Sequence, residues 1–329
     1  MSPAWFGCAD RARQRDDPMI GSAPYAQGWL LIEHSGPWAV EALVGSGIDP
    51  AVLGALSAAA AATGTRILLV RRPGRQSVDQ APGWTAVGPT RTVRGTWQTD
   101  TDLLVAATTV RSLADRRSAA TIQASVAEAA PREPVVLVCA HGTHDTCCAV
   151  RGRPVAAALA ARWPELVWEC SHLGGDRFAP NVVVLPDAAY YGNLDADSAV
   201  RVVADHLAGR LDVRWLRGLA RFPPPAQTAI AEVHRRFGPL PSSAVVAGAV
   251  EQLDLHHWRV PVSGAGRRWL ATVVAERREP AVLTCRAPSA TPATAYRVVS
   301  LQPRSLPGSG ASPTLPPPPP GHSSPESGR

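Results

Sequence analysis

A strand–helix–strand order occurs twice in the sequence, and this repeated order is the strongest constraint on what the chain can fold into. The three segments of each unit are residues 29–33, 50–62 and 66–70 in the first, and residues 134–139, 148–162 and 166–170 in the second. The strands are short apolar runs, whereas the helices are rich in alanine, which has a high helix propensity. Two strands joined through a helix favour parallel pairing, so we predict an α/β protein.

The second unit continues in a way that is typical of a thioredoxin-like layer. A third strand at residues 181–185 leads into a turn and a short hairpin. A closing helix at residues 197–207 follows, with Asp195 or Asp197 as its N-cap and Gly209 as its stop. We expect an α/β N-terminal half to pack against this layer and a small α+β region to follow it.

The remaining segments carry weaker signals. We predict helices at residues 39–44, 118–129 and 211–237, the last broken at prolines 223–225, and short strands at residues 85–87, 94–98, 258–260, 269–274, 281–285 and 296–301. From Pro303 onward Pro, Ser and Gly dominate. Such a segment buries too little apolar surface to fold, so we predict that this tail is disordered.

Charge and hydropathy argue against nucleic-acid and membrane partners. The net charge is +6 and all 33 basic residues are arginines, but they are scattered rather than gathered into a basic stripe with aromatic residues. The longest weakly polar run, residues 51–62, is shorter than the roughly 20 residues that a membrane-spanning helix needs. Residues 1–17 contain no apolar core of a secretory signal, so we expect a cytoplasmic protein.

The six cysteines are unevenly placed, because four of them lie between residues 139 and 170. In a reducing cytosol, such clustering indicates metal or redox chemistry rather than disulfides. Cys8 and Cys285 lie far from the others in sequence, and we expect them to be free thiols without a partner.

Three chemistry-bearing residues lie where strands end. Cys139 ends one strand, Cys148 begins the next helix, and His172 follows the next strand. Parallel strands deliver their carboxyl ends to one edge of a sheet, so these side chains can converge, and Gly174-Gly175 would let the backbone pass close to a bulky ligand. Thiolate and imidazole ligands suit zinc or iron–sulfur chemistry. The eight residues between the two cysteines match neither the short spacing of structural zinc sites nor the Cys-x-x-Cys of thiol oxidoreductases.

Several short motifs can be read together with this pair of cysteines. They are Cys139-x8-Cys148, His172-Leu173-Gly174-Gly175, Arg177-Phe178-Ala179-x-Asn181, Leu185-Pro186, Tyr191-Gly192, Gly21-Ser22-Ala23, residues 29–34 and Gly36-Pro37-Trp38. On these motifs the sequence resembles the sucrase/ferredoxin-like family, also described as thioredoxin-like [2Fe-2S] ferredoxins, over roughly residues 8–210. We therefore divide the chain into an N-terminal α/β half at 1–130, a thioredoxin-like [2Fe-2S] domain at 131–212, a helical and β region at 213–302 and the tail at 303–329.

The resemblance implies that Cys139 and Cys148 ligate one iron of a [2Fe-2S] cluster and that His172 supports the other. In one branch of the family the turn reads His-x-Gly-Gly-His and both histidines are ligands, whereas this chain has Asp176 at the second position. The candidates for the fourth ligand are Asp176, Cys170, Cys147 and His141. Histidine ligation would raise the reduction potential above that of an all-cysteine ferredoxin.

The expected function is therefore electron transfer, as a redox carrier rather than an enzyme, with another redox protein as partner. Two alternatives remain open. One is a thiol-based redox enzyme without a cluster, in which Cys147 or Cys148 reacts. The other is an interaction module stabilised by zinc.

Overall fold

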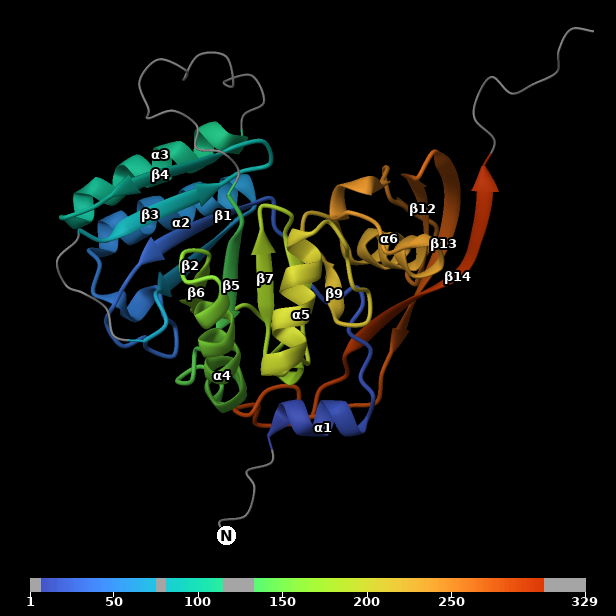
Figure 1. Cartoon of the computed structure of the whole chain (residues 1–329), viewed down its shortest axis with the longest axis horizontal. Helices are drawn as coiled ribbons and strands as arrows, with labels where there is room; N and C mark the ends of the chain where they lie inside the picture. The colour runs from blue at the N-terminus through green and yellow to red at the C-terminus, as the bar shows by residue number, and fades with distance from the viewer. Residues whose placement is uncertain (1–6, 75–80, 115–132, 305–329) are drawn as a thin grey trace, which may run out of the picture.

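The computed structural model describes residues 7–74, 81–114 and 133–304, which form two sheets and six α-helices (Figure 1). The large sheet is mixed, with the strand order β4-β3-β1-β2-β6-β5-β7-β8-β9. Its strands are β1 Gly28–Glu33, β2 Thr65–Arg71, β3 Gly83–Val87, β4 Thr92–Thr96, β5 Val135–Cys139, β6 Val167–Cys170, β7 Val182–Leu185, β8 Ala189–Tyr191 and β9 Leu216–Leu219. The chain is thus a mixed α/β protein, as the sequence predicts.

The second sheet is antiparallel and lies beyond β9 (Figure 1). Its strands are β10 Val245–Ala247, β11 Glu251–Gln252, β12 His257–Gly264, β13 Arg267–Arg277 and β14 Thr294–Arg304. The helices are α1 Cys8–Gln14, α2 Pro50–Thr63, α3 Leu103–Ala114, α4 Thr146–Arg162, α5 Ala196–Leu207 and α6 Pro224–Phe237. None of the helices in the described ranges is long and apolar enough to cross a membrane.

Both predicted strand–helix–strand units are confirmed. β1 pairs in parallel with β2 through α2, and β5 pairs in parallel with β6 through α4. Asp49 caps α2 by accepting hydrogen bonds from two backbone amides, and Gly64 ends this helix in a left-handed conformation. The two units join where the ends of β2 and β6 pair in antiparallel fashion, Val70 opposite Cys170. The large sheet therefore contains strands from both sides of the expected domain boundary at residue 130. The division of the chain at that position stays a prediction.

The hydrophobic core of the described residues has three parts. Alternate residues of β1 belong to two of them on opposite faces of the sheet, Trp29 and Leu31 to one and Leu30 and Ile32 to the other. α2 and α3 pack on each other and cover β2 and β3, whereas α4 and α5 pack together and α4 covers β5 and β6. Helix α6 contacts β9 of the large sheet and β10, β12, β13 and β14 of the small one. This helix therefore joins the core of the C-terminal sheet to that of the large sheet.

Two predicted helices are wrong. Residues 39–44 form no α-helix, because the carbonyl oxygens of residues 38–40 accept hydrogen bonds from side chains of residues 141–144 instead. Residues 211–222 form no helix either, because β9 in their middle pairs with β8 to complete the sheet. Helix α6 begins within the predicted proline break, at Pro224.

Other differences lie at the ends of the chain. Helix α1 lies at residues for which no helix is predicted from the sequence. The predicted strand at 281–285 is wrong, since Ala281 forms only an isolated bridge to Thr291. Strand β14 continues through residues 303–304, so the predicted disorder is wrong for these two residues. The predicted helix at 118–129 and the tail from residue 305 lie outside the described residues.

His234 of α6 should make the protein sensitive to mild acid. The side chain is buried, neither ring nitrogen has a hydrogen-bond partner in the described part of the chain, and burial lowers the pKa of His234 from 6.5 to about 4. The folded-state pKa of His234 lies below the unfolded value. Burial of the neutral imidazole is therefore fully tolerated above pH 6.5, and the protein loses stability as the pH falls toward 4, because the unfolded chain binds the proton more readily.

Urea unfolding of the wild type and of His234→Leu across this pH range tests the effect. We expect the wild type to lose about 2–3 kcal/mol more than the variant between neutral pH and pH 4. Parallel pH profiles of the two proteins would contradict the assignment.

Candidate metal centre

Two buried thiols and an imidazole meet at the carboxyl ends of β5 and β6. Cys139 is the last residue of β5, Cys148 lies in the first turn of α4, and His172 follows β6 by two residues. Their ligand atoms lie within 4.8 Å of one another. Both cysteines are buried, whereas 28% of the His172 side chain is exposed. The structure thus brings three of the predicted ligands together.

A glycine in α4 allows this approach. A Cβ atom at Gly152 would overlap the carbonyl oxygen of Cys139, so only glycine lets the helix pack this closely against the end of β5. The start of α4 is fixed by Asp145, whose Oδ1 accepts a hydrogen bond from the backbone amide of Cys147 at 2.8 Å. Packing and capping together place Cys148 beside Cys139.

The glycine turn after β6 is held by a buried arginine. Gly174 and Gly175 have φ values of 86° and 78°, a region that favours glycine. Arg217 of β9 donates hydrogen bonds of 2.7 Å to the carbonyl of Gly174 and to the side-chain oxygen of Asn181. Its guanidinium also occupies the space that a side chain at Gly175 would need. The sequence analysis missed Arg217 because it placed residues 211–222 in a helix.

Asp176 lies beside the group formed by Cys139, Cys148 and His172 rather than within it. Its Oδ1 lies 3.1 Å from His172 Nδ1 and accepts a hydrogen bond of 3.4 Å from the Cys148 thiol. Only 2% of the side chain is exposed. The donor atoms of Asp176, His172 and His144 form a second group within 4.8 Å, which shares His172 with the first.

His144, in the loop before α4, packs directly on the site. Its ring stacks on that of His172 with the centroids 3.7 Å apart. Nδ1 of His144 donates to the carbonyl of Val40 at 3.1 Å, and Nε2 lies 3.9 Å from Asp176 Oδ2. An imidazole that binds a metal is usually oriented by a hydrogen bond from its other ring N–H to a backbone carbonyl or a carboxylate. Loop contacts of this kind leave no periodic signal in the sequence.

The other three candidates for the fourth ligand lie elsewhere. His141 uses both ring nitrogens, since Nε2 donates to the carbonyl of Ala39 at 2.7 Å and Nδ1 accepts from the amide of His172 at 3.2 Å. Cys170 is buried within β6, and Cys147 belongs to a separate cluster with Cys8. The described geometry therefore leaves Asp176 and His144 beside the three converging residues.

The charges of the site compensate one another. A hydrogen bond from Cys148 lowers the pKa of Cys139 well below its ordinary value, and His172 lowers it further against the effect of burial. Burial opposes protonation of His172, but contacts with Asp176 and Cys139 outweigh it and raise the pKa of His172 to about 9. Burial also disfavours the charged form of Asp176, yet His172 keeps the pKa of this carboxyl below its usual value. The site thus favours the thiolate of Cys139 and the carboxylate of Asp176, the forms that bind metals. The contact with Cys139 and burial instead raise the pKa of Cys148.

A second cluster of cysteine side chains lies on the other side of the start of α4. The thiol of Cys8 lies 3.5 Å from that of Cys147, which lies 3.4 Å from that of Cys285. Asp145 completes this group. The expectation that Cys8 and Cys285 lack a partner is therefore wrong.

Replacing Gly152 should disturb the metal centre through packing alone. We expect Gly152→Ala to cost about 1–3 kcal/mol of stability and to weaken metal retention, because α4 must move away from Cys139. Gly54→Ala in α2 is the matched control, since no heavy atom lies within 4 Å of its added Cβ, and it should gain about 0.5–1 kcal/mol. Thermal unfolding with metal analysis measures both; an unchanged Gly152→Ala protein would refute the packing constraint.

Comparison with known proteins places the chain. No curated protein matches it. A thioredoxin-like [2Fe-2S] ferredoxin from Aquifex aeolicus is 21% identical, with 28% of this chain and 97% of that one covered and a TM-score of 0.25. A cysteine-to-serine variant of the thioredoxin-like [2Fe-2S] ferredoxin from the same organism is 24% identical, with 26% and 97% covered and a TM-score of 0.23. The sucrase/ferredoxin-like family model matches residues 19–218, more than half of the chain, and the chain therefore belongs to the sucrase/ferredoxin-like family.

Proposed function

We propose that the protein is an electron carrier with a [2Fe-2S] cluster on a thioredoxin-like unit, held by Cys139, Cys148, His172 and Asp176. The observation that carries this proposal is the convergence of these donors at the ends of β5 and β6, with the thiols buried and the imidazole partly exposed. Membership of the sucrase/ferredoxin-like family supports it.

The donor set suits such a cluster. Thiolates are the usual ligands of iron–sulfur clusters, and histidine can replace cysteine on one of the two irons. Nδ1 of His172 is buried and has no aligned hydrogen bond among the described residues, although Asp176 lies within ion-pair distance. Because the pKa of His172 is raised to about 9, its imidazole becomes available as a ligand when metal binding displaces a proton. When bound, the cluster would supply one-electron chemistry, which none of these side chains supplies alone.

The exposed side of the site supports exchange with a protein partner. Cys139 and Cys148 lie inside, whereas His172 and His144 expose 28% and 31% of their side chains. An electron would therefore enter and leave on the imidazole side. We propose a redox protein, either a reductase or an oxidoreductase, as the partner at this surface. All six cysteines are free, as expected in the reducing cytoplasm that we propose as the location.

Asp176 is the fourth donor in this proposal. Its Oδ1 contacts both Cys148 and His172, and it is nearly inaccessible to solvent. His144 is then the residue that restrains the His172 ring by stacking. A carboxylate is a harder ligand than imidazole, so the assignment of the fourth donor needs its own test.

Cys139→Ser tests the cluster itself. Protein purified without oxygen should contain two irons and two acid-labile sulfides per chain and absorb in the visible range, and the variant should lose most of both. The control is Cys170→Ala, which removes a buried thiol of the neighbouring strand that belongs to neither donor group. A Cys139→Ser protein with unchanged iron and absorption would refute the ligand assignment.

The fourth donor is tested by comparing Asp176→Asn with His144→Phe. Asp176→Asn removes the charge at constant size, so we expect lower iron occupancy and a shifted electron paramagnetic resonance spectrum of the reduced protein. His144→Phe preserves the stacking surface and should retain the iron. The reverse result would assign the fourth position to His144.

The same preparation separates the two alternatives. A reactive thiol needs access to its substrate, but Cys147 and Cys148 are completely buried, which weighs against the thiol enzyme. Reversible reduction by dithionite and reoxidation by a one-electron acceptor would support the carrier. Colourless protein with zinc in place of iron would favour the interaction module.

A further inference from the structure

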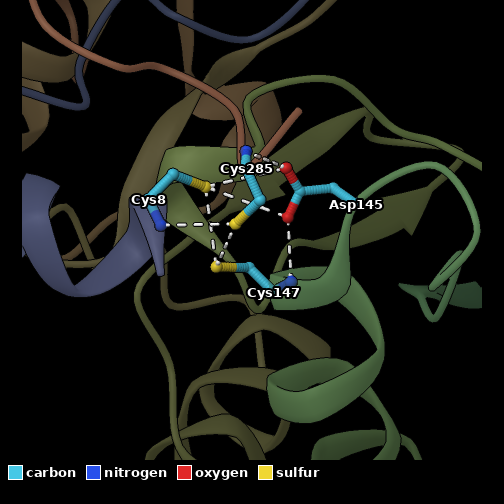
Figure 2. A group of neighbouring side chains, drawn as sticks. All are labelled: Cys8, Asp145, Cys147 and Cys285. Atoms are coloured by element: carbon cyan, nitrogen blue, oxygen red, sulfur yellow. Dashed lines mark hydrogen bonds between the residues drawn. The ribbon is translucent and has the colours of Figure 1, made fainter. Parts of the chain in front are cut away.

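A compact cluster of four side chains lies outside the candidate metal centre described above (Figure 2). It consists of Cys8, Asp145, Cys147 and Cys285. The residues come from three distant parts of the chain. Cys8 begins α1, Asp145 and Cys147 lie at the start of α4, and Cys285 lies in the connection between β13 and β14. α1 and that connection lie side by side below α4 in Figure 1.

The distances within this cluster match one tetrahedral ion. With zinc–sulfur bonds of about 2.3 Å, a tetrahedral zinc ion holds its sulfur ligands about 3.8 Å apart. The Cys8–Cys147 and Cys147–Cys285 sulfur distances are 3.5 and 3.4 Å. The Cys8 sulfur lies 3.7 Å from Asp145 Oδ2. Movements of a few tenths of an ångström would therefore admit the ion.

Hydrogen bonds from backbone amides orient two of the thiols and the carboxylate of this cluster. The sulfur of Cys147 accepts a hydrogen bond from the amide of Ala9 at 3.4 Å, and the sulfur of Cys285 accepts one from the amide of Cys8 at 3.4 Å. Asp145 is 0% exposed and accepts from the amides of Cys147 and Cys285, at 2.8 and 2.6 Å. Such bonds orient donors around a metal and stabilise negative charge on them.

From this geometry we propose that Cys8, Cys147 and Cys285, with Asp145 as the fourth donor, bind a structural zinc ion. Three thiolates suit zinc, which also accepts a carboxylate oxygen. Binding converts three thiols to thiolates, and their protons pass to the buffer. The site shares no residue with the centre of Cys139 and Cys148, so it stands or falls independently of the proposed cluster.

The zinc site would hold two segments outside the family match against the region that the family model covers. The family match covers residues 19–218, so Asp145 and Cys147 lie inside it and Cys8 and Cys285 lie outside. A closed site with four protein donors is the arrangement of structural rather than catalytic zinc. Its role is to hold α1 and the β13–β14 connection against the start of α4.

A disulfide is the competing explanation. Three thiols cannot all pair, and sulfur distances of 3.4 and 3.5 Å are far longer than the roughly 2.05 Å of a bond. Burial of an unpaired third thiol next to a carboxylate would gain nothing, whereas a cation satisfies all four donors. Intact-mass measurement distinguishes the two, because each disulfide lowers the mass by two hydrogens.

The test uses the full chain, purified with a reductant and without oxygen, in the Cys139→Ser background so that the first centre is disabled. We expect about one zinc per chain there, and an at least tenfold weaker zinc affinity in a chelator competition when Cys8→Ser or Cys285→Ser is added. Cys170→Ser, which removes a buried thiol outside both groups, should leave the affinity unchanged. An unchanged affinity in Cys8→Ser or Cys285→Ser would overturn the proposal.

Alkylation of the wild type keeps the proposal testable even if those variants fail to fold. Cys285 is partly exposed, unlike the buried thiols of Cys8 and Cys147. Zinc should slow iodoacetamide modification of Cys285 at least tenfold relative to chelated protein, as read by peptide mass spectrometry. Cobalt in place of zinc should give thiolate charge-transfer and tetrahedral absorption bands. Equal modification rates with and without zinc, or a disulfide between any two of these cysteines in the reduced preparation, would refute the zinc site.

Discussion

The first turn of α4, capped by Asp145, is the constraint on which both cysteine clusters depend. Successive side chains of an α-helix point about 100° apart. Cys147 and Cys148 are adjacent in the sequence, yet one thiol faces Cys8 and Cys285 and the other faces Cys139 and Asp176. The hydrogen bond from the Cys147 amide to Asp145 fixes where the helix begins. A start shifted by one residue would rotate both thiols away from their groups.

Arg217 provides the support on the opposite side of the metal centre. Burial of a guanidinium is costly unless its donors are satisfied. Arg217 meets this requirement by bonding to the turn at Gly174, to Asn181 and to both the side chain and the carbonyl of Ser22. Burial lowers the pKa of Arg217 to about 10, so it remains charged at neutral pH. One side chain thereby links the N-terminal segment, the glycine turn and β9.

The convergence of Cys139, Cys148 and His172 could be predicted from sequence because it follows from periodic structure. Apolar runs locate β5 and β6, parallel pairing brings their ends together, and Cys139 and His172 therefore come near Cys148. The contacts of His144 depend on the conformation of a loop. Arg217 was missed for another reason: its segment contains residues compatible with a helix, and only pairing with β8 makes it a strand.

The cluster of Cys8, Cys147 and Cys285 could not be predicted from sequence, because it depends on tertiary packing alone. Cys8 and Cys285 are separated by 277 positions and lie in segments with no strong secondary-structure signal. The vicinal cysteines carried a partial clue, since neighbours on a helix cannot both face one site. That clue indicates a second environment but not the residues that form it.

The central claim is that two adjacent cysteines serve two different metal sites. X-ray absorption at the iron and zinc edges of one anaerobic wild-type sample tests it most directly. The account predicts an iron edge with iron–iron and iron–sulfide scattering, and a zinc edge with mainly sulfur neighbours near 2.3 Å and one lighter neighbour near 2.0–2.2 Å. A sample with a single metal, or a zinc edge with the outer-shell scattering of an imidazole ligand, would contradict it.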